Sequence, residues 1–290
     1  MLELQYDCPT TLQDVLGLLD SGTARLLAGG TDLIPQLREG RRPASRVVDL
    51  KRIPELNAIE RRPDGGWRIG AAVTISKLGQ NSAFAAEQGA LLASAQLIGS
   101  LQIQNRASLG GNVCNAAPSA DAVPLLICLG AGAEIAGSSG RPTIPVASVA
   151  MAPGRTTLAD DEILVALVLP AVRPRTAAAY QRFTPRREMD IAIAGAGAWM
   201  ELDAGGLIVD AKIALASVAP TTLVATLAQR LLVGSKPALA LFKEAASVAA
   251  QEARPISDTR GSADYRRHLV AVLTRRVLET CAAALGCKVA

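Results

Sequence analysis

The chain has 290 residues, which predicts two or three folded units because one hydrophobic core rarely grows beyond roughly 250–300 residues. Half of the residues are apolar but only 3% are aromatic, so the sequence has few aromatic side chains on which nucleic-acid bases could stack. The net charge of +4 is dispersed along the chain and forms no basic tract of the kind that binds nucleic acid. The longest uncharged apolar run, residues 122–133, is far shorter than the roughly 20 residues of a membrane span, and the five cysteines show no CxxC spacing. We therefore expect a cytoplasmic protein without a signal, a membrane span, a metal site or bound nucleic acid.

The first fifty residues predict a small α/β unit. Apolar positions at helical spacing indicate a helix over residues 12–19, and residues 24–28 indicate a short strand. The strand runs into Gly29-Gly30-Thr31-Asp32, after which residues 33–38 can form a turn or two of helix, followed by a strand over 46–50. A glycine loop at the carboxyl end of a strand lies where open α/β sheets bind ligands.

The middle of the chain alternates short strands with helical segments. A hairpin turn at residues 64–66 separates two short strands, and residues 83–99 predict one longer helix. That helix leads to a second glycine stretch, Ser108 to Asn112. Ser119 or Asp121 could cap the helix that follows, and the apolar run 162–169 indicates a strand.

The proline-bearing segment 170–174 is the best domain boundary, and an α+β unit follows it. Residues 178–183, 191–202 and 207–218 predict three strands, with a hairpin turn over 203–206 between the last two. Residues 238–252 and 262–284 predict two helices. The expected domains are therefore 1–54, 55–172 and 173–290.

The two glycine stretches, residues 28–33 and 108–112, have the composition of phosphate cradles. Each combines two consecutive glycines with a hydroxyl residue and an amide or carboxylate, which suits the close approach of main-chain N–H groups to an anion. Our hypothesis is that they hold one dinucleotide from two sides. A plain turn between strand and helix is the alternative for each stretch taken alone. No GxxxxGK[ST] sequence occurs, so the sequence excludes a P-loop NTPase.

The other candidate residues each have a structural alternative. Asp32 and Asp121 could bond ribose or ribityl hydroxyls, or act as helix N-caps. The run from Arg182 to Asp190 could place a cation near an anionic cofactor ring, or be a solvated basic loop. Gly195 and Gly197 resemble half of a Rossmann fingerprint but precede a hairpin turn, which favours a tightly packed strand. His268, the only histidine, lies in no acidic or cysteine cluster, and we nominate no catalytic residue.

Several short motifs occur in order along the whole chain. They are Leu27-Ala28-Gly29-Gly30-Thr31-Asp32-Leu33, Val48-Asp49-Leu50, Ile69-Gly70-Ala71, Gln104-Asn105-Arg106-Ala107-Ser108-Leu109-Gly110-Gly111-Asn112, Pro118-Ser119-Ala120-Asp121, Met189-Asp190-Ile191-Ala192, Val218-Ala219-Pro220-Thr221 and Arg254-Pro255-Ile256-Ser257-Asp258. Together they resemble the FAD-binding medium subunit of the molybdenum hydroxylases, a family that includes the flavoprotein subunits of carbon monoxide dehydrogenase and xanthine dehydrogenase. Ser108, Leu109 and Ala117 stand where Thr, Ile and Ser are commoner in that family.

The resemblance implies an α+β fold in which two N-terminal subdomains form an FAD-binding fold of the vanillyl-alcohol oxidase type, followed by an α+β C-terminal domain with a three-stranded sheet and helices. It implies that Asp121 contacts ribityl or ribose hydroxyls, that Leu164 lies near the adenine or the flavin, and that Arg182 lies near the cofactor. It also implies which residues hold the FAD pyrophosphate: Ala28, Gly29, Gly30, Thr31, Asp32, Leu33 and Ile34 from one side, and Ser108, Leu109, Gly110, Gly111 and Asn112 from the other. Leu27 is implied as a further cofactor-binding residue.

The function implied by the resemblance is that of an electron-transfer subunit. A molybdopterin-binding large subunit would oxidise the substrate, 2Fe–2S clusters of a small subunit would carry the electrons to FAD, and FAD would pass them to an external acceptor, in a dimer of heterotrimers. The residues agree, because the chain has no iron–sulfur cysteine pattern and no acid–base constellation. Two alternatives stay open: a stand-alone FAD-dependent oxidase or reductase acting directly on a small substrate, and a nucleotide-binding assembly subunit.

Overall fold

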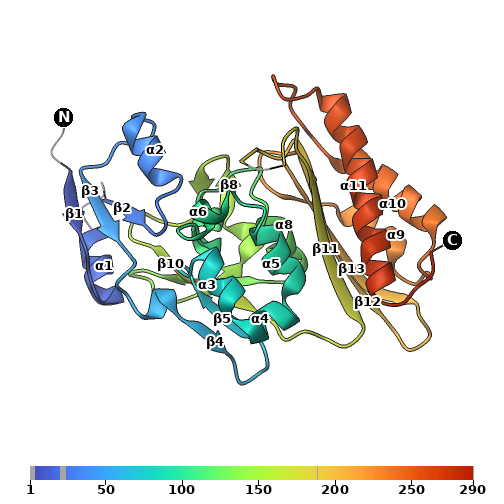
Figure 1. Cartoon of the computed structure of the whole chain (residues 1–290), viewed down its shortest axis with the longest axis horizontal. Helices are drawn as coiled ribbons and strands as arrows, with labels where there is room; N and C mark the ends of the chain where they lie inside the picture. Colours follow the sequence, from blue (N-terminus) through green and yellow to red (C-terminus); the bar gives the residue numbers. More distant parts are fainter. Residues whose placement is uncertain (1–3, 20–23, 188, 290) are drawn as a thin grey trace.

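The computed structural model describes residues 4–19, 24–187 and 189–289, and its strands form three main sheets that follow one another along the molecule (Figure 1). The first sheet is parallel, with the order β1-β3-β2. Its helices, α1 and α2, connect successive strands, as parallel pairing requires. The predicted α/β unit is confirmed, with one additional strand at its start. Its elements are β1 (Gln5–Asp7), α1 (Leu12–Leu19), β2 (Ala24–Leu27), α2 (Leu33–Arg38) and β3 (Arg46–Asp49).

The central sheet is antiparallel, with the order β4-β5-β10-β6-β7, and a group of short helices packs on it. Its strands are β4 (Ile59–Arg61), β5 (Trp67–Gly70), β6 (Gly132–Ala136), β7 (Thr143–Pro145) and β10 (Ile163–Leu169). The helices are α3 (Ile75–Gln80), α4 (Ser82–Glu87), α5 (Gly89–Ala95), α6 (Leu101–Gln104), α7 (Leu109–Cys114) and α8 (Val123–Cys128). Two 3-10 turns, η1 (Glu55–Asn57) and η2 (Val146–Ser148), and a small hairpin, β8 (Ala150–Ala152) with β9 (Arg155–Thr156), complete this part.

The prediction of one helix over 83–99 is wrong, because the segment breaks between α4 and α5. Gln88 leaves the helical conformation, and its N–H bonds back to the carbonyl of Phe84, which ends α4. The break lets Phe84 pack edge-to-face on Trp67, with ring centroids 5.4 Å apart, while Leu91 and Leu92 of α5 enter the same core. Tertiary packing of an aromatic pair therefore overrides a continuous helical pattern.

Strand β10 is buried on both faces and joins two hydrophobic cores. Ile163 and Val165 face the core shared with the first sheet, whereas Leu164, Leu167 and Leu169 face the core of the central sheet. The pairing register of β10 with β6 shifts between Leu164 and Ala166, which is how Leu164 and Leu167 come to lie on one side. A continuous run of aliphatic residues is what such a doubly covered strand needs.

The C-terminal sheet has the order β11-β12-β13-β14 and lies between two helical layers (Figure 1). Helices α11 and α9 pack on one face, with α10 packed against both of them, and α8 of the central part packs on the other, where Pro124 fills the space left by Gly197. The three predicted strands are confirmed, and a two-residue fourth strand extends the sheet. No described helix has the length and apolarity that crossing a bilayer requires. The elements are β11 (Thr176–Phe183), β12 (Ala194–Leu202), β13 (Ile208–Ala216), β14 (Leu223–Val224), α9 (Thr226–Leu232), α10 (Leu239–Glu252) and α11 (Ala263–Ala284).

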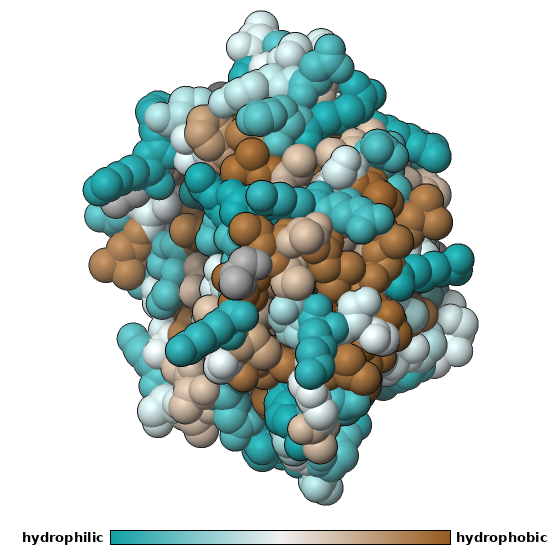
Figure 2. Space-filling model, turned by 90° about the vertical axis from the view of Figure 1, so that its right-hand side faces the viewer, coloured by the Kyte–Doolittle hydropathy of each residue, from teal (hydrophilic) through white to brown (hydrophobic). Residues whose placement is uncertain are grey.

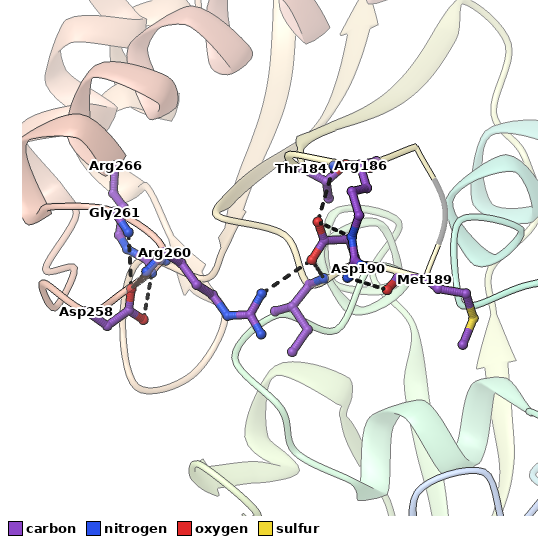
Figure 3. Close-up of polar contacts among 9 residues, drawn as sticks. Thr184, Arg186, Met189, Asp190, Asp258, Arg260, Gly261 and Arg266 are labelled. Carbon is purple, nitrogen blue, oxygen red and sulfur yellow. Dashed lines mark hydrogen bonds and ion pairs between the residues drawn. The ribbon is translucent and has the colours of Figure 1, made fainter.

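Arg266, near the start of α11, ties three segments of the C-terminal part together. Its side chain is 4% exposed, and it donates to both carboxylate oxygens of Asp258 at 2.8 Å and to the carbonyls of Ile193 at 2.7 Å and Ser217 at 3.2 Å. Ser217 has a φ of +64°, so this bond holds a strained residue in place. Figure 3 shows the next link, in which Arg260 reaches Asp190 in the loop between β11 and β12.

We expect Arg266→Met to lower the free energy of unfolding by about 2–3 kcal/mol, because it takes the donor from the buried carbonyl of Ile193 and the part-buried carbonyl of Ser217. It also removes the cation that pairs with Asp258, whose Oδ1 keeps two backbone N–H donors. Urea unfolding of the full chain measures the change. The control is the neighbouring Arg267→Met, whose side chain is 43% exposed and pairs with the exposed Asp264. That control should stay within about 0.5 kcal/mol of the wild type. Equal losses in the two variants would contradict the role given to Arg266.

Candidate functional site

A cavity of about 290 Å³ lies where the first sheet meets the central sheet. Most of its wall comes from three stretches of chain: β2 with the loop into α2, the residues around α7, and the segment that leads from β9 into β10. Both glycine stretches contribute to this wall, through Ala28, Gly29, Gly30, Thr31, Asp32, Leu33, Ser108, Gly110, Gly111 and Asn112. Two motifs that are about eighty residues apart in the sequence therefore face one cavity.

The two consecutive glycines of each stretch have different roles. A Cβ on Gly29 would lie 2.1 Å from the carbonyl oxygen of Arg106, and one on Gly110 would lie 2.4 Å from that of Ala71, so both permit contact between main chains. Gly30 has a φ of +79°, a conformation that favours glycine. A Cβ on Gly111 would meet only Ser108 Oγ, at 3.1 Å, and otherwise open space. Gly29 thus brings the first stretch against the segment before the second, and Gly110 lets α7 lie against the end of β5. Gly111 leaves room on the cavity side.

Backbone donors at the two helix starts are left free for a ligand. Within the described residues, the N–H groups of Thr31, Asp32 and Leu33 before and at the start of α2, and that of Gly110 in α7, donate no hydrogen bond. Ser108 caps α7 by accepting from the Gly111 N–H at 3.0 Å. Free N–H groups at a helix start attract anions. The cavity is therefore suited to a phosphate group.

Asp32 and Asn115 join α2 to the end of α7 beside the cavity. Asn115 Oδ1 accepts from Gln36 Nε2 at 3.2 Å, and the Asn115 side chain also hydrogen-bonds to Asp32. Burial raises the pKa of Asp32, against the opposing effects of Arg42, Arg41 and Asn115. Asp32 stands at the N-cap position of α2 but makes no side-chain cap bond. The capping interpretation is therefore wrong for this residue.

Asp121 and Arg182 form a buried ion pair outside the cavity wall. Asp121 Oδ2 accepts from Arg182 Nη1, Asp121 Oδ1 accepts from the Tyr180 hydroxyl at 2.8 Å, and both charged side chains are 7% exposed. Burial raises the pKa of Asp121 to about 6, while Arg182 and Tyr180 oppose the shift. Gly195 makes room for this cluster, since a Cβ there would lie 2.4 Å from the Tyr180 hydroxyl. The pair fastens the segment before α8 to β11.

These contacts change the sequence-based interpretation of both charged residues. The N-cap of α8 is Ala122, without a side-chain cap, so neither Ser119 nor Asp121 caps that helix. Arg182 points inward to Asp121, whereas Arg186 of the same run is 71% exposed, as a solvated loop predicts. The tightly packed strand predicted at Gly195 and Gly197 is confirmed.

The structure brings most of the predicted cofactor residues together. Leu164 joins the ten residues of the glycine stretches in the cavity wall. Leu27 and Leu109 are buried beside it, Ile34 is 45% exposed, and none of the three belongs to the wall formed by the described residues. Asp121 and Arg182 lie outside the wall as well. Contact of each of these residues with FAD stays a prediction.

The cavity also has wall residues that the sequence did not single out. They include Arg25, Arg42, Cys114, Asn115 and the segment 156–162. Asn115 could have been found, since it continues the second glycine stretch by one turn of helix. The segment 156–162 has no motif and reaches the cavity only because β10 places it there. Burial raises the pKa of the Cys114 thiol to about 12, which keeps it uncharged at neutral pH.

We expect Arg182→Met to destabilise the fold more at pH 8 than at pH 5. Asp121 binds its proton more tightly when folded, so its ionisation costs stability as the pH rises from about 4 through 6, and Arg182 limits that cost. Without Arg182 the pKa of Asp121 in the folded state rises further. The additional loss of unfolding free energy then approaches about 1.4 kcal/mol per pH unit above pH 6. Urea unfolding at both pH values measures it, with the exposed Arg186→Met as control. A loss that is the same at pH 5 and pH 8 would contradict the prediction.

The sequence matches known families and proteins along nearly its whole length. Residues 2–172 match the family described as the FAD binding domain in molybdopterin dehydrogenase, and residues 178–281 match the CO dehydrogenase flavoprotein C-terminal domain. The chain is 33% identical to the xanthine dehydrogenase FAD-binding subunit of Escherichia coli O157:H7, over 98% of this chain and 97% of that one. It is 31% identical to the carbon monoxide dehydrogenase medium chain of Hydrogenophaga pseudoflava, over 94% and 95%.

Solved structures show the same relationship in three dimensions. A chain of the reconstituted CO dehydrogenase from Oligotropha carboxidovorans superposes with a TM-score of 0.92 at 30% identity, covering 97% of this chain and 98% of that one. A chain of quinoline 2-oxidoreductase from Pseudomonas putida 86 superposes with a TM-score of 0.90 at 29% identity, with the same coverage. This chain therefore belongs to the FAD-binding medium-subunit family of the molybdenum hydroxylases, which includes the flavoprotein subunits of carbon monoxide dehydrogenase and xanthine dehydrogenase.

Proposed function

We propose that this chain carries FAD as an electron relay between the 2Fe–2S clusters of a partner subunit and an external acceptor. The observation that carries the proposal is the single cavity faced by two glycine stretches with free backbone donors. A relay needs a site that binds and orients its cofactor, and it needs no acid or base beside a substrate. The described wall residues include no histidine, Cys114 is held as an uncharged thiol, and the wall also contains three carboxylates. They are Asp32, Asp160 and Glu162.

The residues present fit FAD. Thr31, Asp32, Leu33 and Gly110 would offer backbone N–H groups to the pyrophosphate, and Gly111 leaves the space that it needs. Asn112 Oδ1 is buried without a hydrogen-bond partner in the described chain, as a group waiting for a ligand donor would be. Bound FAD would supply the redox chemistry, because a flavin exchanges electrons singly or in pairs.

The proposed partners are a molybdopterin-binding large subunit and a 2Fe–2S small subunit, assembled as a dimer of heterotrimers in the cytoplasm. The five cysteines are all free thiols, which suits a reducing compartment. Large apolar side chains stay exposed on the C-terminal part, among them Leu227, Leu231 and Val233. Figure 2 shows hydrophobic surface spread over this side of the molecule. Surface of this kind supports contact with other subunits.

Purification of the tagged chain from its own host tests the relay. We expect FAD, molybdenum and iron to elute in one complex, and a substrate of the large subunit to reduce the flavin only while the iron is present. If the chain elutes with FAD but without the metals, and a small substrate reduces its flavin directly, the stand-alone oxidase or reductase is the correct function. A chain that elutes without any flavin would support the assembly-subunit alternative.

We expect Gly111→Val to weaken FAD binding at least about tenfold without unfolding the chain, because Gly111 lies in the cavity wall and its Cβ position meets only Ser108 Oγ, at 3.1 Å. The flavin content of the purified variant and its urea unfolding curve provide the two measurements. Gly89→Val is the matched control, since Gly89 also has open space around its Cβ position but lies outside the cavity wall. Full flavin content in the Gly111 variant would show that the second stretch does not border the cofactor.

A further inference from the structure

A second cavity, of about 330 Å³, lies between the central part and the C-terminal sheet, where α5 and α8 pack against β11 (Figure 1). Its wall comes from the break between α4 and α5, the end of α8, the linker 170–173 and one face of the C-terminal sheet. The described wall residues of the two cavities do not overlap. Strand β10 begins at the first cavity and leads into the linker that borders the second, so the two cavities are separate sites.

Gln88 lies in the wall of this second cavity without a hydrogen-bond partner. It is 5% exposed, and its side-chain amide bonds to no residue in the described part of the chain. The side chains of Gln36, Gln104 and Gln229 are less buried, and each donates to another group of the protein. A buried amide without a partner costs stability, and it has two N–H donors and an acceptor oxygen to offer. The cavity is the space into which Gln88 can bond.

The indole N–H of Trp199 is a second free donor in the same wall. Trp199 is 7% exposed, and its Nε1 donates to none of the described residues, whereas Trp67 Nε1 donates to Glu87 at 3.0 Å. Buried tryptophan N–H groups usually find an acceptor. The Arg173 guanidinium carbon lies over the Trp199 ring, 4.8 Å from its centroid, and covers one face of it. The N–H is on the ring edge and stays open to a ligand.

The charged side chains of the described wall leave no charge for an ionic ligand to meet. There are two carboxylates and two cations, so the charges of the wall balance. Each of the four is also paired within the protein, and a charged ligand would have to break one of these pairs. The cavity therefore suits an uncharged molecule, and its volume is that of a small-ligand pocket. The ion pairs are Arg173 with Glu201, Lys212 with Asp210, and Glu87 with Arg61.

An amide or a lactam has the groups that these two side chains lack. Its N–H can donate to the side-chain oxygen of Gln88 while its C=O accepts from the Gln88 nitrogen, which gives a pair of parallel hydrogen bonds. The second lone pair of that C=O, or another acceptor of the molecule, can take the Trp199 N–H. The apolar remainder would lie against the aliphatic part of the wall, which includes Leu129, Pro170 and Val172.

We propose that this cavity is a second ligand site, which binds a small uncharged amide or lactam through Gln88 and Trp199. The site is separate from the cavity that the glycine stretches face, so the proposal does not depend on FAD binding there. Because the wall comes from both the central part and the C-terminal sheet, a bound ligand would stabilise the two against each other.

The test is a calorimetric titration of the full chain with 2-pyridone, a six-membered lactam, and with N-methyl-2-pyridone, which lacks the N–H donor. We expect 2-pyridone to bind saturably, and methylation to raise its Kd about tenfold or more, because the methyl group prevents the paired hydrogen bonds. Gln88→Met should raise the Kd of 2-pyridone by a similar factor and leave that of the methylated probe unchanged. Gln251→Met, at an exposed glutamine of α10 outside both walls, is the control and should change neither constant.

Three results would overturn the proposal. Absence of saturable binding would mean that the cavity holds only water. Equal constants for the two probes would exclude the paired hydrogen bonds, and an unchanged constant in Gln88→Met would place the probe elsewhere. Gln88→Met should leave the urea unfolding of the ligand-free chain unchanged or shifted to higher urea, since it removes an amide without a protein partner. Even if that variant did not fold, the two probes on the wild-type chain would still decide between the outcomes.

Discussion

The approach of main chain to main chain at Gly29 and Gly110 is the constraint on which the site depends. A Cβ on Gly29 would stand 2.1 Å from the carbonyl oxygen of Arg106 and would push the loop of the first sheet away from the segment before α7. A Cβ on Gly110 would stand 2.4 Å from the carbonyl oxygen of Ala71 and would push α7 away from the end of β5. Glycine has no intrinsic advantage in forming a turn at these two positions, because neither needs a positive φ. Glycine is needed at these positions because it has no side chain. The close backbone approach that it permits brings hydrogen-bond donors from two parts of the chain to one small cavity.

Strand β10 fixes the position of the first sheet relative to the central sheet. Its two faces belong to two different cores, so the first sheet and the central sheet cannot shift relative to each other without opening one of them. Close-packed cores resist such shifts. The same strand begins at the cavity, where Ile163 and Leu164 form part of the wall. The bonds from Asn115 to Gln36 and Asp32 add a polar link across the rim.

Strands, helices and loops that depend on neighbouring residues were predictable from the sequence, whereas contacts between residues far apart in the chain were not. The strand, glycine loop and helix over residues 24–38 follow from periodicity and from the positions of the glycines, and β10 follows from an unbroken aliphatic run. The break between α4 and α5 depends on Phe84 meeting Trp67, and the pairing of Asp121 with Arg182 spans 61 residues.

Buried polar groups that hydrogen-bond to other parts of the protein have structural roles, whereas those without a protein partner are candidates for ligand binding. In the C-terminal part, Arg266 also has an unpartnered Nε, but its other two nitrogens make four hydrogen bonds, and Arg182 is paired with Asp121. These arginines hold segments of protein together. At the cavity, Asn112 Oδ1 and the backbone donors of Thr31 to Leu33 are unpaired in the described chain. A ligand that binds there would satisfy groups that the fold leaves open, so its binding free energy would add directly to the stability of the first and central sheets.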